Sequence, residues 1–176
     1  EVDGRPYIVM ELVDGESLHD RLARGALDLR TAVDLSCQVA DGLAAAHGAA
    51  VVHRALKPRN IMVTTSDRRA KIVDFGLGKT SPKPVGSDEA TMRASGITDE
   101  YVIVGTAGYM APEQCTRRPV DFRADQFALG AVIYEMLTGQ RAFKRDTAFQ
   151  TMSAIVESEP EPLAEACPTA PFELIT

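Results

Sequence analysis

The residues whose types and spacing could do chemistry fall in four short segments that follow one another along the chain. Residues 53–60 read HRALKPRN, residues 74–76 read DFG, residues 105–113 read GTAGYMAPE and residues 121–130 read DFRADQFALG. Taken alone, DFG is a common turn, Asn60 is a polar loop residue, and Asp125 is an acid that a helix N-terminus favours. The joint order and spacing of the four segments is what indicates a functional site.

In that order and spacing, the segments resemble the catalytic loop, the metal-binding loop, the Ala-Pro-Glu segment and the central helix of protein kinases. The resemblance covers essentially the whole chain and is strongest to the eukaryotic-like serine/threonine kinases of bacteria. Lys57 and the sequence of residues 105–113 favour serine/threonine over tyrosine specificity. The fold that this implies is mainly α with a few short β-strands, namely the C-terminal lobe of the α+β kinase fold, without the upper lobe.

The resemblance implies phosphoryl transfer from ATP to serine or threonine of a protein substrate, with Mg²⁺. Asn60 and Asp74 would hold the magnesium ions through hard oxygen ligands. Lys57 would contact the transferring phosphate as a point charge. Thr106 would lie beside the substrate hydroxyl.

Nucleotide binding is implied at a second group of positions. Residues 7–15 resemble the strand and hinge that join the two kinase lobes, so the backbone of Glu11 and Val13 would meet the edge of the adenine, with Met62 beneath its ring. Arg54 would pair with a phosphate on the long loop. The candidate acceptors of that phosphate are Thr91, Ser95 and Thr98.

Four further positions match the family as structural residues. His53 would pack near Phe75, and Asp125 would brace the catalytic loop from the central helix. Glu113 pairs in the family with an arginine of a later helix, but no arginine follows Arg145 in this chain.

Two departures from an active kinase concern the chemistry itself. Ala55 stands where the family has the aspartate that accepts or orients the proton of the acceptor hydroxyl, which a methyl group cannot do. No GxGxxG occurs, and no lysine precedes Lys57, so the glycine-rich loop and strand lysine that hold ATP from above are absent from these residues. We expect residues 1–176 to be a hinge and C-lobe cut at both ends and catalytically dead. An inactivated kinase and a natural pseudokinase that scaffolds partners both fit this pattern.

Composition bounds the alternatives. The 176 residues carry 19 Lys and Arg against 25 Asp and Glu, a net charge of −6, and residues 146–176 hold six acids with no Lys or Arg. A nucleic-acid-binding protein would show the opposite sign of net charge.

The three cysteines lack the spacing of a zinc site or disulfide framework, which favours reduced thiols and a cytoplasmic location. No apolar run is long enough to predict membrane contact from this segment, although the parent protein could be tethered elsewhere.

Helices are needed to position the site. Apolar spacing predicts a helix over residues 31–47 and a second over residues 124–138, which is apolar nearly all round and therefore central. A short helix is expected over residues 17–24, and Asp146 is a candidate N-cap for a further one.

Strands are predicted from short apolar, β-branched runs at residues 7–10, 51–52, 61–63 and 71–73. A turn at residues 66–69 joins the last two. Residues 78–104 lack periodicity and predict a long loop. The acidic, proline-containing residues 157–171 also predict a loop.

Overall fold

A computed structural model describes residues 9–75 and 106–168, which form six helices, one 3-10 turn and a small antiparallel sheet. The elements in chain order are β1 (Gly15–Ser17), α1 (Leu18–Leu22), α2 (Leu29–Gly48), η1 (Pro58–Asn60), β2 (Ile61–Thr64), β3 (Ala70–Ile72), α5 (Pro112–Cys115), α6 (Arg123–Thr138), α7 (Ala148–Glu157) and α8 (Leu163–Ala166). Among these residues, no helix combines the length and apolarity needed to cross a membrane.

The sheet has the order β1-β2-β3, with β2 in the centre. Ser17 pairs with Met62, and Ile61 pairs with Ile72, both in antiparallel register. Ile61 and Val63 are buried while the alternate residues of β2 are half-buried, because successive side chains of a strand point to opposite faces. Met62 therefore lies on the more open face of the sheet.

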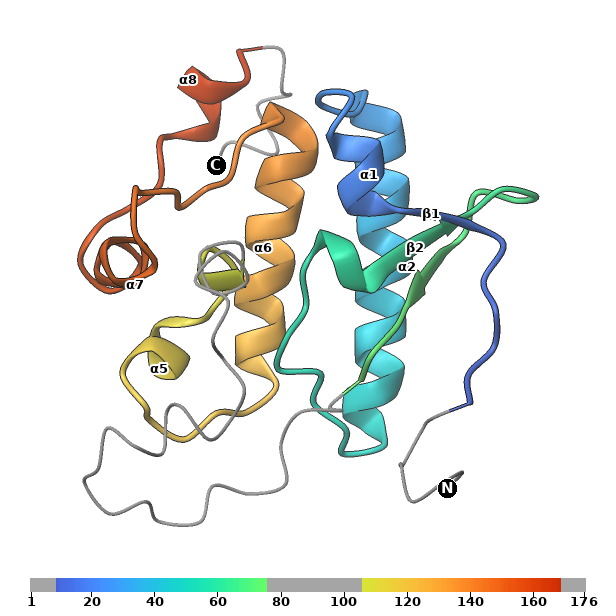
Figure 1. Cartoon of the computed structure of the whole chain (residues 1–176), viewed down its shortest axis with the longest axis horizontal. Coiled ribbons are helices and arrows are strands. Elements are labelled where there is room, and N and C mark those ends of the chain that lie inside the picture. The colour runs from blue at the N-terminus through green and yellow to red at the C-terminus, as the bar shows by residue number, and fades with distance from the viewer. Residues whose placement is uncertain (1–8, 76–105, 169–176) are drawn as a thin grey trace, which may run out of the picture.

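The core lies between α2 and α6. One face of α2 is buried along its length at positions three to four residues apart, namely Ala32, Leu35, Val39 and Leu43. The predicted central helix is confirmed as α6, which contributes buried residues on several sides. Figure 1 shows α6 between the sheet with α1 and α2 on one side and α5 and α7 on the other.

Helix ends follow ordinary capping rules. The Asp28 side chain accepts a hydrogen bond from the Thr31 amide, and Gly139 ends α6 in the left-handed conformation with φ 71°. Thr147, not Asp146, is the N-cap of α7, and its side chain accepts from the Gln150 amide. The predicted cap was therefore wrong by one residue: the Thr147 hydroxyl reaches the amide of the third helical residue, completing a capping box with Gln150.

Two strand predictions were wrong. Val9 and Met10 lie outside any strand, since β1 begins at Gly15, and residues 7–8 lie outside the described part of the chain. Val51 and Val52 are also not in a strand; the Val51 amide donates to the carbonyl of Ala46 and closes the end of α2. A β-branched pair without a neighbouring strand cannot satisfy a ladder.

Two short helices were not anticipated. Residues 112–115 form α5, and α8 interrupts the loop predicted for residues 157–171. Both have only four residues, too few to show a periodic pattern. The loop predicted at residues 78–104 lies outside the described residues.

Candidate active site

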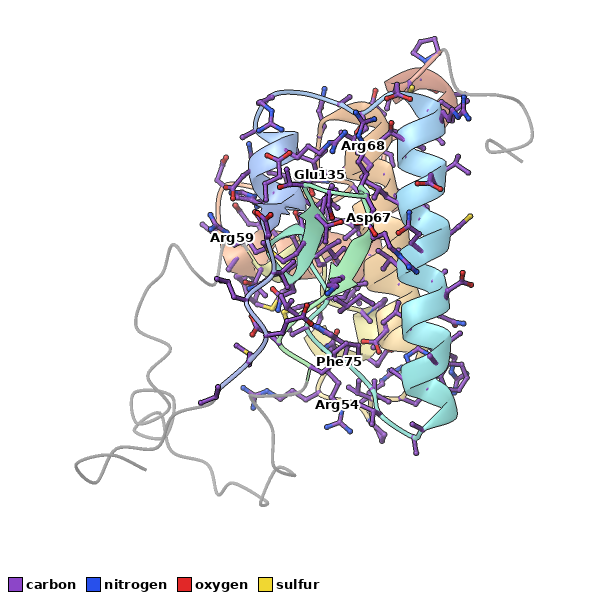
Figure 2. The ribbon with its side chains drawn as sticks, turned by 90° about the vertical axis from the view of Figure 1, so that its right-hand side faces the viewer. Arg54, Arg59, Asp67, Arg68, Phe75 and Glu135 are labelled. Carbon is purple, nitrogen blue, oxygen red and sulfur yellow. The ribbon has the colours of Figure 1, made fainter. Side chains whose placement is uncertain are left out.

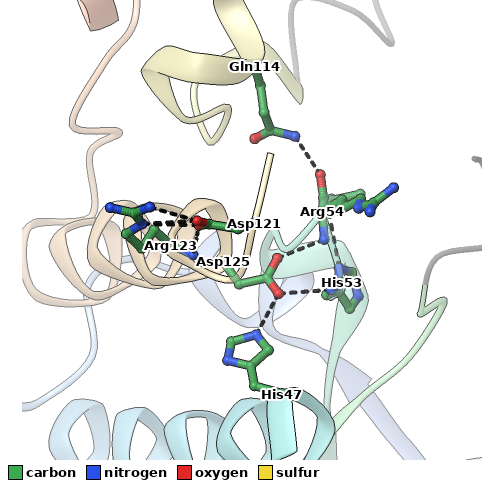
Figure 3. Close-up of polar contacts among 8 residues, drawn as sticks. His47, His53, Arg54, Gln114, Asp121, Arg123 and Asp125 are labelled. Carbon is green, nitrogen blue, oxygen red and sulfur yellow. Dashed lines mark hydrogen bonds and ion pairs between the residues drawn. The ribbon is translucent and has the colours of Figure 1, made fainter. Parts of the chain in front are cut away.

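The segment that resembles a catalytic loop, residues 53–60, is held by Asp125, a fully buried acid in the first turn of α6. Its carboxylate accepts hydrogen bonds from the backbone amides of His53 at 2.8 Å and Arg54 at 2.7 Å (Figure 3). Nε2 of His47, from the last turn of α2, lies 2.8 Å from the same carboxylate. Three donors thus satisfy one buried charge, as a buried ion requires.

His53 links this segment to the residues after β3. The Ala55 amide donates to its Nδ1 at 3.2 Å, so Nδ1 carries no proton and Nε2 donates to the Val73 carbonyl at 3.0 Å. The Phe75 ring meets the imidazole edge-on, with 4.8 Å between ring centroids. The imidazole therefore uses both nitrogens for contacts within the protein.

Two non-glycine residues of the site adopt left-handed backbone conformations. Arg54 has φ 66° and Asp74 has φ 62°. Such conformations cost about 1–3 kcal/mol and persist where the surroundings fix them. At Arg54 the fixing contacts are the amide bond to Asp125 and a 2.8 Å hydrogen bond from the Gln114 side chain to the Arg54 carbonyl.

Lys57 and Thr106 meet although they are 49 residues apart, with 3.1 Å between Nζ and Oγ1. Burial lowers the pKa of Lys57, the positive charge of Arg59 lowers it further, and Asp74 acts in the opposite direction. Ala55 lies two residues before Lys57 and is exposed to solvent. The residue at position 55 is therefore open to solvent in the same loop as Lys57.

Asn60 and Asp74 lie on adjoining pieces of backbone. Asn60 is buried at the end of η1, and its carbonyl accepts from the Val73 amide at 2.9 Å. Asp74 follows directly and is exposed. An amide oxygen and a carboxylate are hard ligands that suit Mg²⁺, so the donor set fits that ion.

Of the predicted adenine-contacting residues, Glu11 and Val13 lie on the segment before β1, and Met62 lies in the central strand β2. Glu11 is exposed and forms an ion pair with Lys71 at 2.5 Å, and Val13 is half-buried. Val9 and Leu12 beside them are 88% and 93% exposed. This segment therefore exposes apolar side chains beside a charged one in the described part of the chain.

Sequence reasoning missed a second buried acid of α6. Glu135 accepts a hydrogen bond from the Tyr109 hydroxyl, and Arg141 lies 4.0 Å from its other oxygen and over the Tyr109 ring. Burial raises the pKa of Tyr109, and the Glu135 charge adds to the effect. The available signal was an acid within an otherwise apolar helix.

The remaining predicted residues are only partly brought into the site. Glu113 lies in α5, half-buried, and its carbonyl accepts from the Arg118 amide. Thr91, Ser95 and Thr98 lie outside the described residues.

Comparison with known protein families shows the family of the chain. The family model described as "Protein kinase domain" matches residues 1–169. The chain belongs to the protein kinase family. Its kinase fold is seen here as a small three-stranded antiparallel sheet with six helices in the described residues.

Individual relatives define the branch of kinases. The serine/threonine-protein kinase PknA of Mycobacterium tuberculosis is 38% identical over 170 residues, covering 96% of this chain and 37% of PknA. PknL of the same species is 37% identical over 183 residues, with 96% and 43% covered. The probable serine/threonine-protein kinase PknB of Corynebacterium glutamicum is 34% identical, with 94% and 25% covered.

These relatives confirm the resemblance to bacterial eukaryotic-like serine/threonine kinases. The chain spans between 25% and 43% of the length of the three kinases compared.

Proposed function

We propose that residues 1–176 are the hinge and C-terminal lobe of a serine/threonine kinase domain whose phosphoryl transfer is blocked at one position, Ala55. The observation that carries this proposal is an ordered catalytic loop around an alanine. Asp125 holds the loop backbone, and Lys57 meets Thr106 across 49 residues of sequence. The loop around position 55 is thus held in place by these contacts, but the alanine side chain has no atom that can accept a proton.

Each neighbouring residue has a role in this proposal. Asn60 and Asp74 would hold Mg²⁺, which supplies charge neutralisation to the phosphates. Lys57 would steady the transferring phosphate, and Thr106 would lie beside the acceptor hydroxyl. His53, Phe75 and Asp125 would keep the loop in shape through the contacts described above.

The adenine would bind between the segment that holds Glu11 and Val13 and the more open face of the sheet, which carries Met62. Val9 and Leu12 beside these residues are exposed, so an apolar ring bound there would pack against them. The phosphate-covering half of the pocket is assigned to an upper lobe outside these 176 residues. By the family resemblance, Glu113 would pair with an arginine of a later helix.

Regulation is proposed at Arg54, which is exposed and could pair with a phosphate carried by Thr91, Ser95 or Thr98. We assign the domain to the cytoplasm, on the spacing of its cysteines and the location of ATP-dependent signalling.

A pseudokinase scaffold is the second candidate function, and Ala55 is the observation that favours it. In this case the domain would bind a protein partner, with or without ATP, and transfer no phosphate. Both candidates predict that the protein as it stands transfers no more phosphate from Mg-ATP than its Asp74→Ala variant.

Replacing Ala55 with aspartate separates the two candidates. The full-length protein with Ala55→Asp is incubated with labelled ATP, and autophosphorylation is compared with the wild type and with Ala55→Asn, which adds similar bulk without a carboxylate. We expect a gain of about 10² or more for the aspartate alone, the contribution of a positioned general base. If ATP binds and Ala55→Asp gives no gain over Ala55→Asn, the kinase proposal fails and the scaffold remains.

A further inference from the structure

The half-buried ammonium group of Lys57 is bonded to a neutral group and not to an acid. Its Nζ donates to the Thr106 hydroxyl at 3.1 Å, and in the described part of the chain Lys57 forms no ion pair with a carboxylate. The charge of Arg59 acts on Lys57 unfavourably, and the charge of exposed Asp74 acts on it favourably. Because a charge held partly away from water is stabilised by an opposite charge, this place favours an anion.

The donors that remain around this contact suit a phosphate. An ammonium group has three N–H donors, and Thr106 accepts one of those of Lys57. The Thr106 hydroxyl still has its own hydrogen to donate, since in this contact it accepts. A phosphate on a side chain carries a charge of about −1.5 to −2 at neutral pH and three strong acceptor oxygens. Both the number of donors and the sign of the charge therefore fit a phosphate group.

The backbone on both sides of Lys57 is fixed before any ligand binds. The amide of Ala55 donates to Nδ1 of His53 at 3.2 Å, and the side chain of Leu56 is fully buried. The Lys57 carbonyl accepts from the Asn60 amide at 2.9 Å and starts the turn η1. A ligand that binds a preorganised loop loses less free energy in ordering it, which favours affinity.

Arg59 is a second cation beside Lys57. One N–H of its exposed guanidinium donates to Nε2 of His19 in α1, with 2.9 Å between the nitrogens, which leaves further donors. Figure 2 shows Arg59 well apart from Arg54 and Phe75, which lie towards one end of the molecule. A phosphate held by Lys57 and Arg59 is therefore a different phosphate from the one proposed for Arg54. We call Lys57, Thr106 and Arg59 together the Lys57 site.

The alanine at position 55 changes the charge of this loop. Ala55 and Lys57 are two residues apart, so their Cα atoms lie within about 7 Å of each other. An aspartate at position 55 would add a negative charge there and repel a phosphate. Alanine adds none, and its exposure leaves the loop accessible to another protein. A phosphorylated side chain that an aspartate would help to release is thus retained beside an alanine.

We propose that the Lys57 site binds a phosphorylated serine or threonine of a partner protein. Lys57 and Thr106 donate hydrogen bonds to the phosphate, and Arg59 adds positive charge. The proposal rests on the roles proposed above for Lys57 and Thr106, and it gives the pseudokinase candidate a partner of defined chemistry. The binding requires no transfer of phosphate.

The test measures binding to the full-length protein by fluorescence anisotropy, in EDTA, so that the phosphate meets only groups of the protein. Three labelled pools of ten-residue peptides share random neutral flanks and differ at one central position, which is phosphoserine, serine or glutamate. We expect the phosphoserine pool to bind at least tenfold more tightly than either of the others, and to weaken as salt is raised. Equal binding of the phosphoserine and serine pools would overturn the proposal.

Variants then locate the phosphate. Lys57→Met keeps a side chain of similar length without the charge and should weaken the phosphoserine pool at least tenfold. Lys144→Met is the matched control, because Lys144 is an exposed lysine after the end of α6, and it should bind like the wild type. Circular dichroism checks that each variant is folded. Equal binding by Lys57→Met and Lys144→Met would contradict the assignment.

Position 55 provides a second matched pair. Ala55→Asp should weaken the phosphoserine pool at least tenfold through repulsion, whereas Ala55→Asn, of similar bulk and no charge, should bind like the wild type. If both variants bind equally, the absence of a carboxylate at position 55 is not what retains the phosphate, and the proposal fails.

Asp74 gives a change of the opposite sign. Its carboxylate is the acid whose charge acts on Lys57, so in EDTA it competes with a bound phosphate. Asp74→Asn removes that charge, and asparagine tolerates the left-handed backbone with φ 62° at this position. We expect this variant to bind the phosphoserine pool more tightly than the wild type does. Weaker binding would overturn the proposed place of the phosphate.

Competition distinguishes a phosphorylated protein from a free anion. Inorganic phosphate and ATP should displace the phosphoserine pool only at concentrations at least tenfold above that of the peptide. Displacement at equal concentration would show that the site takes a free anion, and would overturn the proposal. A gain of autophosphorylation in Ala55→Asp, without any preference for phosphoserine, would support the kinase proposal and refute this one alone.

Discussion

The two buried acids of α6 hold two different segments of the site, and they do so by different means. Asp125, near the start of the helix, accepts from two backbone amides of the catalytic loop and from His47. Glu135, near the end of the helix, accepts from the Tyr109 side chain and lies near Arg141. The Asp125 contacts to the loop are made to backbone amides and do not depend on which side chains the loop residues carry. The Glu135 contact depends on the phenol of Tyr109.

This difference explains how a catalytic loop can remain ordered around Ala55. Backbone amides are present whatever residue stands in the loop. The side chain at position 55 can therefore change without loss of the contacts that shape the loop. Segment 106–111, by contrast, is expected to respond to both mutation and pH at Tyr109.

The largest effect is expected for Asp125→Ala. It leaves the buried amide of His53, the partly buried amide of Arg54 and His47 without their acceptor. Each unsatisfied buried donor costs about 1–3 kcal/mol, so we expect a loss of about 3 kcal/mol or more in the free energy of unfolding. Urea denaturation of the protein measures it. Asp121→Ala is the control, because the pair of Asp121 with Arg123 is exposed and is worth less than about 1 kcal/mol. Similar losses for both variants would contradict the anchoring role of Asp125.

A smaller effect is expected for Tyr109→Phe. It removes one hydrogen bond to a charged, buried acceptor, a loss of about 1.5–3 kcal/mol at neutral pH. Burial raises the pKa of Tyr109 in the folded state above its unfolded value of about 10. The neutral phenol therefore stabilises the fold fully below about pH 10, and this contribution is lost as the pH rises beyond that value.

The phenylalanine variant cannot show this alkaline loss. We expect the stability difference between wild type and Tyr109→Phe to narrow above about pH 10 in urea denaturation series. Tyr134→Phe is the comparison: burial, with the charge of Glu161, also raises the pKa of this half-buried tyrosine, so we expect a narrowing of the same sign but smaller size there. A difference that stays constant across that pH range would refute the assignment.

The smallest effect is expected for the stability of Ala55→Asp. Position 55 is exposed, so the free energy of unfolding should change by less than about 0.5 kcal/mol. Ala107→Asp is the matched contrast, since Ala107 is buried and a carboxylate there would lose its hydration. If Ala55→Asp destabilised the protein as much as Ala107→Asp, the loop would depend on its side chains after all.

Sequence periodicity located the two main helices because their burial is regular. Residues 31–47 and 124–138 were expected to be helical, and the structure extends them only to Leu29–Gly48 and Arg123–Thr138. Local signals were weaker guides where a tertiary contact decides the outcome. Val51 and Val52 have strand-forming side chains, but the chain there turns back onto α2.

The site was accessible to sequence reasoning in a different way. Its residues were identified by motif resemblance, and their individual roles stay predictions. Glu135 has no motif of its own: an acid in an apolar helix shows that a partner must exist, but Tyr109 emerges as that partner only when the chain folds.

The sequence separation of the Asp125 contacts has a consequence for the order of events in folding. Asp125 meets His53 across 72 residues and Glu135 meets Tyr109 across 26. By chain-closure entropy alone, the longer loop costs about 0.9 kcal/mol more to close. The catalytic loop should therefore gain its anchor late, after local helices have formed and paired. Loss of Asp125 would then act mainly by accelerating unfolding, with little change in the refolding rate.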